Sequence, residues 1–334
     1  MSVSDPAVLQ LPDSVEFTSY PLSELLDSRP LPHPPEDFAD FWLATYEELT
    51  RPRTDVRVER FESGSGRIVQ RISFRSSTGD RVLGWLVGPE SGHPVRGGLV
   101  ISHGYGGRAE PVPEQVPADA AAIFPVAPWL PDNPDGLPGA EHVLIGIGER
   151  ERYSHRFSVA DIWRAASVLL EQFPGAADRL DYRGGSFGGG IGALALPWER
   201  RFRRAVLDVP SFGDFPIRLS RPCTGSGEAV RQHLTEHPQD RPMLDYFDAA
   251  ISARLITIGV QVSAARLDPS VDPRGQFAVY RALGGPKQLV VRTAGHAEFP
   301  GDQEENARLE SAARDFLAAD SIEDLVPRID LTDR

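Results

Sequence analysis

The residues best suited to chemistry lie around Ser186, within the sequence Gly-Gly-Ser-Phe-Gly of residues 184–188. This G-x-S-x-G pattern is typical of a sharp strand-to-helix turn, in which flanking glycines avoid clashes and the serine hydroxyl is exposed. A helix that begins at the serine also directs free N–H groups toward a developing oxyanion. The pattern predicts a nucleophilic serine, and a structural glycine turn is the alternative.

Two further segments could complete a hydrolytic site. The sequence His103-Gly-Tyr-Gly-Gly follows an apolar run, and such a loop can direct the Tyr105 N–H at a substrate carbonyl oxygen, opposite the N–H of Phe187. His296 follows another apolar run late in the sequence, where the histidine of a Ser, Asp, His order falls. We therefore expect an oxyanion hole formed by Tyr105 and Phe187, with His296 as general base. A plain glycine turn and a structural histidine are the alternatives.

Three aspartates are candidates for the acid that orients this histidine. Asp268 follows the apolar run over 255–262 and lies between the serine and the histidine in the sequence. Asp272 precedes Pro273, so it is better explained as the N-cap of a helix. Asp208 ends the strand after the serine's helix, which is a less usual place for the acid. We expect Asp268 to be the acid, and the other two remain open.

Apolar segments indicate the elements that must position these side chains. Three early segments are separated by turn sequences and predict antiparallel strands, after which strands alternate with helices. That alternation favours an α/β fold with a mostly parallel central sheet flanked by helices, as in the α/β-hydrolase fold. The predicted strands cover residues 56–61, 68–74, 82–87, 98–102, 121–126, 205–209, 255–262 and 288–292.

Helical periodicity is clearest between residues 158 and 173. The apolar positions there fall on one face, Ser158 and Asp161 predict a capping box, and Pro174 ends the helix. A second helix is predicted within 34–49, where four aromatic residues at helical spacing indicate core packing.

The remaining segments are organised around one catalytic domain, residues 1–334. We expect an N-terminal extension over about 1–55, a proline-rich surface loop over 128–139 and a small cap inserted at about 211–248. Two charged residues, Asp181 and Arg183, fall in the strand before the serine, where apolar residues are expected.

Composition excludes several classes of partner. The 334 residues carry a formal net charge of −13, without clustered Lys or Arg, which argues against nucleic acid. No run of apolar residues is long enough for a membrane span, and no export signal is evident, so we expect a cytoplasmic protein that binds no membrane. The single cysteine, Cys223, cannot form an internal disulfide.

One short motif offers a different chemistry. His233 and His237 fit H-x-x-E-H, which on a helix would place two zinc ligands on one face. Chance matches to so short a motif are frequent, and the serine site already accounts for hydrolysis. We expect no metal and no cofactor.

Several motifs together resemble the carbohydrate esterase family of acetyl xylan esterases and cephalosporin C deacetylases. The resemblance runs from PPEDFADFW through HGYGG, GGSFGGGI, LDVPSF, YFDAA and LDPSVDPRGQFAVY to GGPKQLVV and His296. It implies Ser186 as nucleophile, Tyr105 in the oxyanion hole, Asp268 as acid and His296 as base. It also implies a homo-oligomer, a hexamer in many members. The sequence departs from the family at Phe187, which replaces a glutamine, and in the 128–139 loop, which replaces an Arg-Gly-Gln motif.

These observations predict a serine esterase that acts on short acyl esters, acetyl above all, of sugars or similar small molecules. Tyr105, Phe187 and Trp129 are expected to supply bulky walls that shorten the acyl pocket. A hydrolase of larger acyl or peptide substrates is the alternative, because the same three residues serve both reactions. A family member that only binds a ligand is the alternative outside enzymes.

Overall fold

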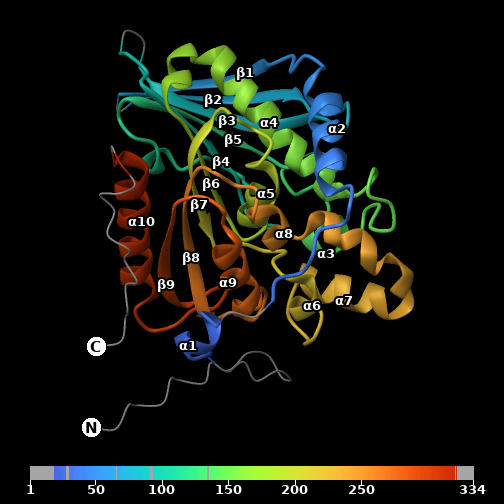
Figure 1. Ribbon diagram of the computed structural model, residues 1–334. Coiled ribbons are helices and arrows are strands. Elements are labelled where there is room, and N and C mark those ends of the chain that lie inside the picture. Colours follow the sequence, from blue (N-terminus) through green and yellow to red (C-terminus); the bar gives the residue numbers. More distant parts are fainter. Residues whose placement is uncertain are drawn as a thin grey trace, which may run out of the picture.

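A computed structural model describes residues 19–27, 30–64, 66–90, 93–133, 135–319 and 321. Its centre is a nine-stranded sheet with the order β1-β2-β3-β5-β4-β6-β7-β8-β9 (Figure 1). The predicted α/β class is therefore confirmed. The strands are β1 Arg57–Gly64, β2 Arg67–Arg75, β3 Arg81–Pro89, β4 Gly97–Ile101, β5 Ala120–Pro125, β6 Leu180–Gly185, β7 Phe202–Asp208, β8 Gly259–Leu267 and β9 Lys287–Ala294.

The sheet has an antiparallel part and a parallel part. Strands β1, β2 and β3 pair antiparallel in sequence order, and β3 joins the rest through an antiparallel pairing with β5. From β5 to β9 every neighbouring pair is parallel. Parallel strands end at the same edge of a sheet, so the residues that follow β4, β6, β8 and β9 are brought together there.

One strand lies further along the chain than the sequence predicts. The run 255–262 was expected to be a strand, but β8 begins at Gly259 and continues to Leu267. Leu255 follows helix α8 and is 44% exposed, so its apolar character does not mark a strand. Asp268 consequently lies directly after the strand.

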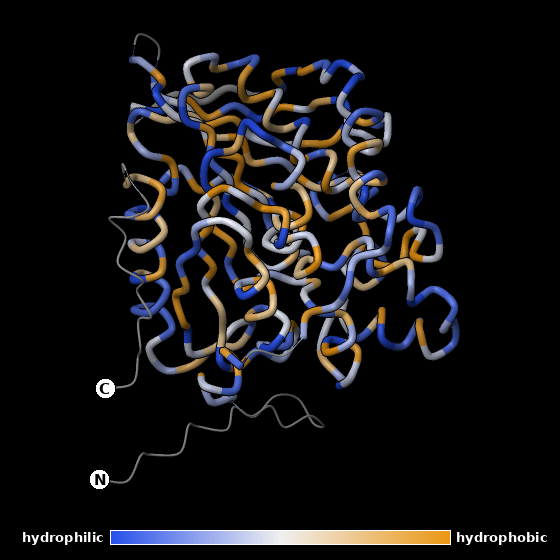
Figure 2. Tube along the Cα trace, in the orientation of Figure 1, coloured by the Kyte–Doolittle hydropathy of each residue, from blue (hydrophilic) through white to orange (hydrophobic). Residues whose placement is uncertain are grey.

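Helices cover both faces of the sheet unequally. One face is covered by α4, α5, α8 and α9, and the other mainly by α10 over β7 and β8 (Figure 1). Apolar residues concentrate in the strands and in the inner sides of these helices (Figure 2). The helices are α1 Leu22–Leu25, α2 Phe38–Thr50, α3 Gly139–His142, α4 Ser154–Gln172, α5 Phe187–Ala195, α6 Phe215–Arg218, α7 Ser226–Glu236, α8 Ala249–Ala253, α9 Pro273–Ala282 and α10 Asp302–Ala318, with short 3-10 helices η1 Pro113–Gln115, η2 Pro174–Asp178 and η3 Pro238–Phe247.

The predicted helix over 158–173 exists, but its start was wrong. Helix α4 begins at Ser154, so Ser158 is an interior residue whose hydroxyl donates to the Ser154 carbonyl. Asp161 is buried and accepts hydrogen bonds from Ser76 and from the N–H of Ser77, at 2.5 and 2.6 Å. Ser158 and Asp161 therefore do not form a capping box, and Asp161 instead links α4 to the turn before β3.

The predicted aromatic helix and the proline-rich loop contribute to the fold in different ways. Helix α2 confirms the predicted aromatic helix, since Trp42 is fully buried and donates to the Tyr246 carbonyl. The 128–139 stretch contains no helix before α3, as expected, yet Leu130 within it is fully buried. This loop is therefore only partly a surface loop, because an apolar side chain anchors it.

The expected cap corresponds to the segment between β7 and β8. It contains α6, α7 and η3 and leads into α8. Helix α6 contacts α9, and helix α7 contacts α3 and η3 (Figure 1). Among the helices that the structure describes, none has the length and apolar character needed to cross a lipid bilayer.

Candidate active site

Ser186 occupies the turn between β6 and α5 with strained backbone angles, φ 53° and ψ −115°. The neighbouring glycines permit this turn. A Cβ at Gly184 would lie 2.5 Å from the Gly188 carbonyl oxygen, and one at Gly188 would lie 2.8 Å from Ser102 Oγ. Any larger residue at either position would therefore force the turn apart. The glycine requirement predicted from the sequence agrees with the structure.

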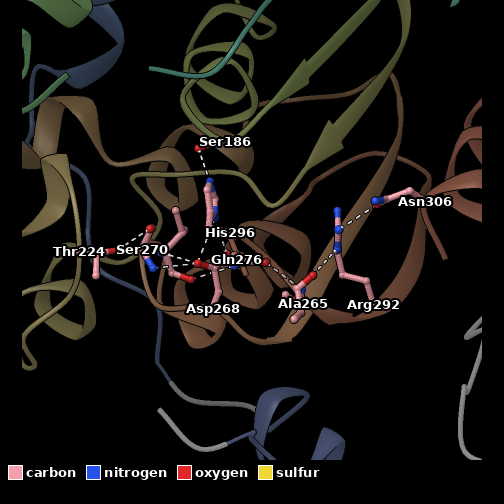
Figure 3. Close-up of polar contacts among 11 residues, drawn as sticks. Ser186, Thr224, Ala265, Asp268, Ser270, Gln276, Arg292, His296 and Asn306 are labelled. Atoms are coloured by element: carbon pink, nitrogen blue, oxygen red, sulfur yellow. Dashed lines mark hydrogen bonds and ion pairs between the residues drawn. The ribbon is translucent and has the colours of Figure 1, made fainter. Parts of the chain in front are cut away.

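His296 and Asp268 continue from the serine in one hydrogen-bonded line (Figure 3). Ser186 Oγ lies 2.8 Å from His296 Nε2, and His296 Nδ1 lies 2.8 and 3.0 Å from the two carboxylate oxygens of Asp268. With a proton on Nδ1, the ring donates to Asp268 and accepts from the serine hydroxyl. The three residues thus have the geometry of a nucleophile, a base and an orienting acid.

The surroundings of Asp268 hold its carboxylate in place. Its side chain is fully buried and accepts from the N–H groups of Ser270 and Val271 and from the Gln276 amide, each at 2.9 Å. Gln276 is itself fixed, because its Oε1 accepts from the Ala265 N–H at 2.8 Å. Sequence reasoning missed Gln276, although its place on the first turns of the helix after the acid could have suggested it.

The two rival acids have other partners. Asp208 accepts from Ser263 Oγ at 2.5 Å and lies 3.7 Å from Arg183. Asp272 caps α9 by accepting from the Arg274 N–H at 2.9 Å and also pairs with the Arg274 guanidinium at 2.6 Å. The structure places neither in contact with His296.

The loop after β4 lies against the serine. A Cβ at Gly104 would come 3.9 Å from Ser186 Cβ, and the Gly188 N–H donates to the His103 carbonyl at 3.0 Å. The N–H groups of Tyr105 and Phe187 have no hydrogen-bond partner in the described part of the chain. This arrangement is compatible with the expected oxyanion hole.

His103 fixes the same loop in a way the sequence did not suggest. Its Nδ1 lies 2.6 Å from the Gly104 carbonyl oxygen, and its Nε2 accepts from the Ala127 N–H at 3.0 Å. Burial lowers the pKa of this imidazole to about 4, so the ring is neutral at pH 7, as both contacts require. His103 therefore joins the oxyanion loop to the residue after β5.

An open cleft of about 520 Å³ lies beside Ser186 on the side toward α10. Arg183 reaches it from β6, with its guanidinium bound to Glu310 of α10 at 2.6 and 2.8 Å. Arg183, which the sequence left unexplained in the strand before the serine, thus joins β6 to α10 through an ion pair. The cleft is lined by Ile101–Gly104, Gly107, Arg108, Glu110, Gln115, Arg183–Ser186, Asp208, Val209 and Arg292.

Two of the expected pocket walls lie elsewhere. The Phe187 ring is fully buried and lies 4.4 Å from the ring of Tyr105, and it does not line this cleft. Trp129 is half-buried against Phe157 at 5.5 Å and does not line the cleft either. Tyr105 is half-buried, and its hydroxyl lies 2.9 Å from His155 Nε2.

The H-x-x-E-H motif lies on α7 and its C-cap, within the cap. His233 Nε2 contacts Asp240 at 2.8 Å, and its ring lies 4.6 Å from the ring of His237. Over the ranges that the structure describes, no group of three or more His, Cys, Asp or Glu side chains is arranged to hold a metal ion.

Solved structures show the same fold. Acetyl xylan esterase from Paenibacillus sp. R4 superposes with a TM-score of 0.76 at 24% identity, covering 88% of this chain and 99% of that one. Acetyl xylan esterase 1 from Thermoanaerobacterium sp. JW/SL YS485 gives 0.73 at 17% identity, covering 90% and 100%. The acylaminoacyl peptidase from Pyrococcus horikoshii gives 0.53 at 13% identity, covering 80% and 52%.

The sheet order, the strained serine turn and these likenesses define an α/β-hydrolase. The family model described as acetyl xylan esterase (AXE1) matches residues 15–123 and 131–310. The chain therefore belongs to the acetyl xylan esterase family, a family of serine-type carboxylesterases, which confirms the resemblance seen in the sequence.

Proposed function

We propose that this protein hydrolyses short-chain esters, acetyl esters above all, through an acyl-enzyme on Ser186. The observation that carries the proposal is the continuous hydrogen-bonded line from Ser186 through His296 to Asp268. Acetylated sugars are the substrate class suggested by the names of the family and of its two similar esterases.

Acylation begins with the proton on Ser186 Oγ. His296 Nε2 takes this proton while Oγ bonds to the ester carbonyl carbon, and the carbonyl oxygen becomes an oxyanion held by the N–H groups of Tyr105 and Phe187. Asp268 stabilises the imidazolium that results. The imidazolium then returns the proton to the alkoxide oxygen as the ester C–O bond breaks, so a neutral alcohol leaves and the acyl group stays on the serine.

Deacylation repeats these steps with water. His296 takes a proton from a water molecule as its oxygen attacks the acyl carbon, and the second oxyanion occupies the same hole. When it collapses, the bond to Oγ breaks and Oγ recovers its proton from the imidazolium. The products are one alcohol, one carboxylic acid and the original enzyme, so no redox partner is needed.

A fluorophosphonate probe separates this enzyme from a family member that only binds a ligand. We expect the probe to label the wild-type protein at one residue and to leave Ser186→Ala unlabelled. Ser167→Ala is the matched control, because that half-buried hydroxyl on α4 donates to a backbone carbonyl and accepts from Arg201. Labelling of Ser186→Ala at the wild-type rate would refute the assigned nucleophile.

The acyl-length preference is tested with p-nitrophenyl acetate, butyrate, hexanoate and octanoate. We expect kcat/KM to fall steeply beyond butyrate, because a chain that clashes prevents the attack geometry rather than only weakening binding. Equal rates for octanoate and acetate would favour the alternative of larger acyl substrates. The homo-oligomer, for which the family resemblance suggests a hexamer, remains a prediction that multi-angle light scattering can test.

A further inference from the structure

Arg218, the last residue of α6, is buried without a hydrogen-bonding or ionic partner among the described residues. Only 6% of the residue is exposed, and its Nε and Nη1 atoms are buried without a hydrogen bond. Its guanidinium makes no hydrogen bond or ion pair with any residue that the structure describes. Its neighbours are the faces of Phe212 and Phe215, at 5.2 and 5.9 Å. Burying a cation without a hydrogen bond or ion pair is strongly unfavourable, so this arrangement favours an anion that is not among the described residues.

Arg218 lies at the N-terminus of helix α7. A Cβ on Gly227 would come 3.0 Å from Arg218 Nη2. The N–H groups of Gly225, Ser226 and Gly227 have no partner among the residues described, as at the start of any helix. Free N–H groups at a helix start favour an anion, and here they lie beside an unpaired guanidinium.

The position adjoins the reaction site from two directions. On one side, the Arg218 guanidinium lies 5.2 Å from the ring of Phe212, and this ring lies 6.4 Å from the ring of Tyr105. On the other side, a small pocket is lined by Arg218, Cys223, Asp268 and other residues. Tyr105 contributes to the oxyanion loop, and Asp268 orients the base.

Short contacts hold the start of the cap helix against the loop that carries Asp268. Thr224 donates its N–H to the Pro269 carbonyl at 2.8 Å, and its hydroxyl lies 2.6 Å from Ser270 Oγ (Figure 3). The pocket has a volume of about 20 Å³, enough for about one water-sized group. A group bound there is therefore compact, such as one carboxylate oxygen.

The two carboxylates of this pocket do not satisfy Arg218. Asp272 is engaged by the Arg274 side chain through contacts of 2.6 and 3.0 Å, and Asp268 by His296 and three further donors. Arg218 and Arg221 line the pocket together with these two acids, both of which already have partners.

We propose that Arg218 and the first turn of α7 bind a carboxylate carried by the ester substrate, so that the enzyme prefers anionic esters. This inference rests on the proposed function and narrows its substrate class. The carboxylate can belong to the acyl half or to the alcohol half of the ester, and the chemistry of recognition is the same for both.

Matched substrate pairs test the preference. For the acyl half, the pair is mono-(4-nitrophenyl) succinate and its neutral succinamate analogue. For the alcohol half, it is 4-acetoxybenzoate and 4-acetoxybenzamide. In the wild type we expect one anionic ester to exceed its neutral partner in kcat/KM by roughly 10- to 100-fold, the value of a charge-assisted hydrogen bond. The pair that shows the difference identifies the half that carries the carboxylate.

Arg218→Met should abolish this ratio, and Arg218→Lys should restore part of it. The matched control is Arg241→Gln, in the cap but paired with Asp245 at 2.7 Å, which should leave the ratio unchanged. Equal rates within both pairs, or a ratio that persists in Arg218→Met and Arg218→Lys, would overturn the inference.

A binding measurement keeps the inference separate from the proposed function. Succinate or benzoate at millimolar concentration should raise the melting temperature of wild-type protein and of Ser186→Ala, but not of Arg218→Met. Loss of all ester turnover with this shift intact would refute the proposed function alone. Turnover of neutral esters without any shift, or a shift that chloride reproduces fully, would refute carboxylate recognition alone.

Discussion

Two largely buried arginines lie near the candidate active site, Arg183 in the cleft beside Ser186 and Arg218 in the small pocket beside Asp268, and they differ in their partners. On the side toward α10, Arg183 is bound to both carboxylate oxygens of Glu310 and lies 3.7 Å from Asp208. On the side toward the cap, Arg218 has no carboxylate within ion-pair distance in the part of the chain that the structure describes. Both are largely buried, so solvent cannot explain the difference.

The comparison separates a structural charge from a binding charge. The Arg183 and Glu310 pair is complete within the chain and joins β6 to α10, so it stabilises the fold without needing a ligand. An arginine whose donors are unsatisfied is destabilising in the free protein and is retained only if something else uses it. Each side also carries an acid near the serine, Asp208 toward α10 and Asp268 toward the cap.

The largest expected effect comes from replacing Ser186, the proposed nucleophile for both neutral and anionic esters. Ser186→Ala should lower kcat/KM by at least about 10⁴-fold for neutral and anionic esters alike, because the nucleophile and base act as a unit. Steady-state kinetics on both substrate pairs, with circular dichroism as the folding control, measure this. If Ser186→Ala lost activity toward the anionic ester alone, the neutral and anionic esters would not be hydrolysed by the same nucleophile.

The next effect compares the two acids. Asp268→Asn should lower kcat by about 10³- to 10⁴-fold, because the amide no longer orients the base or stabilises the imidazolium. Asp208→Asn should lower kcat less than about tenfold, since its carboxylate contacts Ser263 and Arg183 and not His296. Single-substrate kinetics with p-nitrophenyl acetate give both values. The opposite ranking would show that the acid lies on the α10 side.

A smaller effect concerns stability, and its sign should differ between the two arginines. Glu310→Gln leaves Arg183 with a weakened partner and should lower the free energy of unfolding by about 1–3 kcal/mol. Arg218→Met removes an unpaired buried cation and should raise the free energy of unfolding by about 1 kcal/mol or more. Urea denaturation without ligand measures both changes. A loss of stability in Arg218→Met would show that the cation is satisfied in the free protein.

Local sequence was sufficient for features that depend on neighbouring residues. The glycines around Ser186, the antiparallel strands and the aromatic helix α2 follow from steric limits and periodicity, which a sequence displays directly. The order Ser186, Asp268, His296 was also enough to predict three residues that the structure brings within hydrogen-bond distance.

Features that depend on distant segments could not be predicted. Ser158 and Asp161 match a capping box, yet Asp161 is used by the turn before β3, 84 and 85 residues away in the sequence. The partner of Arg183 lies 127 residues away in α10, so the charged strand looked anomalous on its own. The sequence also does not show that the Phe187 ring is fully buried against Tyr105, because this contact joins two distant segments.

Asp181 provides the smallest test, and it concerns the same charged strand as Arg183. The residue is 2% exposed, its Oδ1 has no hydrogen-bond partner, and its other oxygen lies 3.7 Å from Arg179. Burial raises the pKa of this carboxyl to about 6, and the nearby arginines only partly oppose the rise. The folded state therefore binds this proton more tightly than the unfolded chain does, whose aspartate pKa is about 3.9.

The sign of the pH dependence follows from that difference. The stability contributed by protonated Asp181 is complete below about pH 4, declines as the pH rises toward 6, and is absent above that value. Asp181→Asn, which carries no charge, should therefore be more stable than the wild type at pH 8, by on the order of 1–2 kcal/mol, and equal to it near pH 4. Urea denaturation at both pH values measures the difference, with the exposed Asp178→Asn as control. If Asp181→Asn is less stable than the wild type at pH 8, Asp181 is a paired carboxylate in the folded protein, as Glu310 is. The α10 side of the nucleophile would then contain two complete ion pairs.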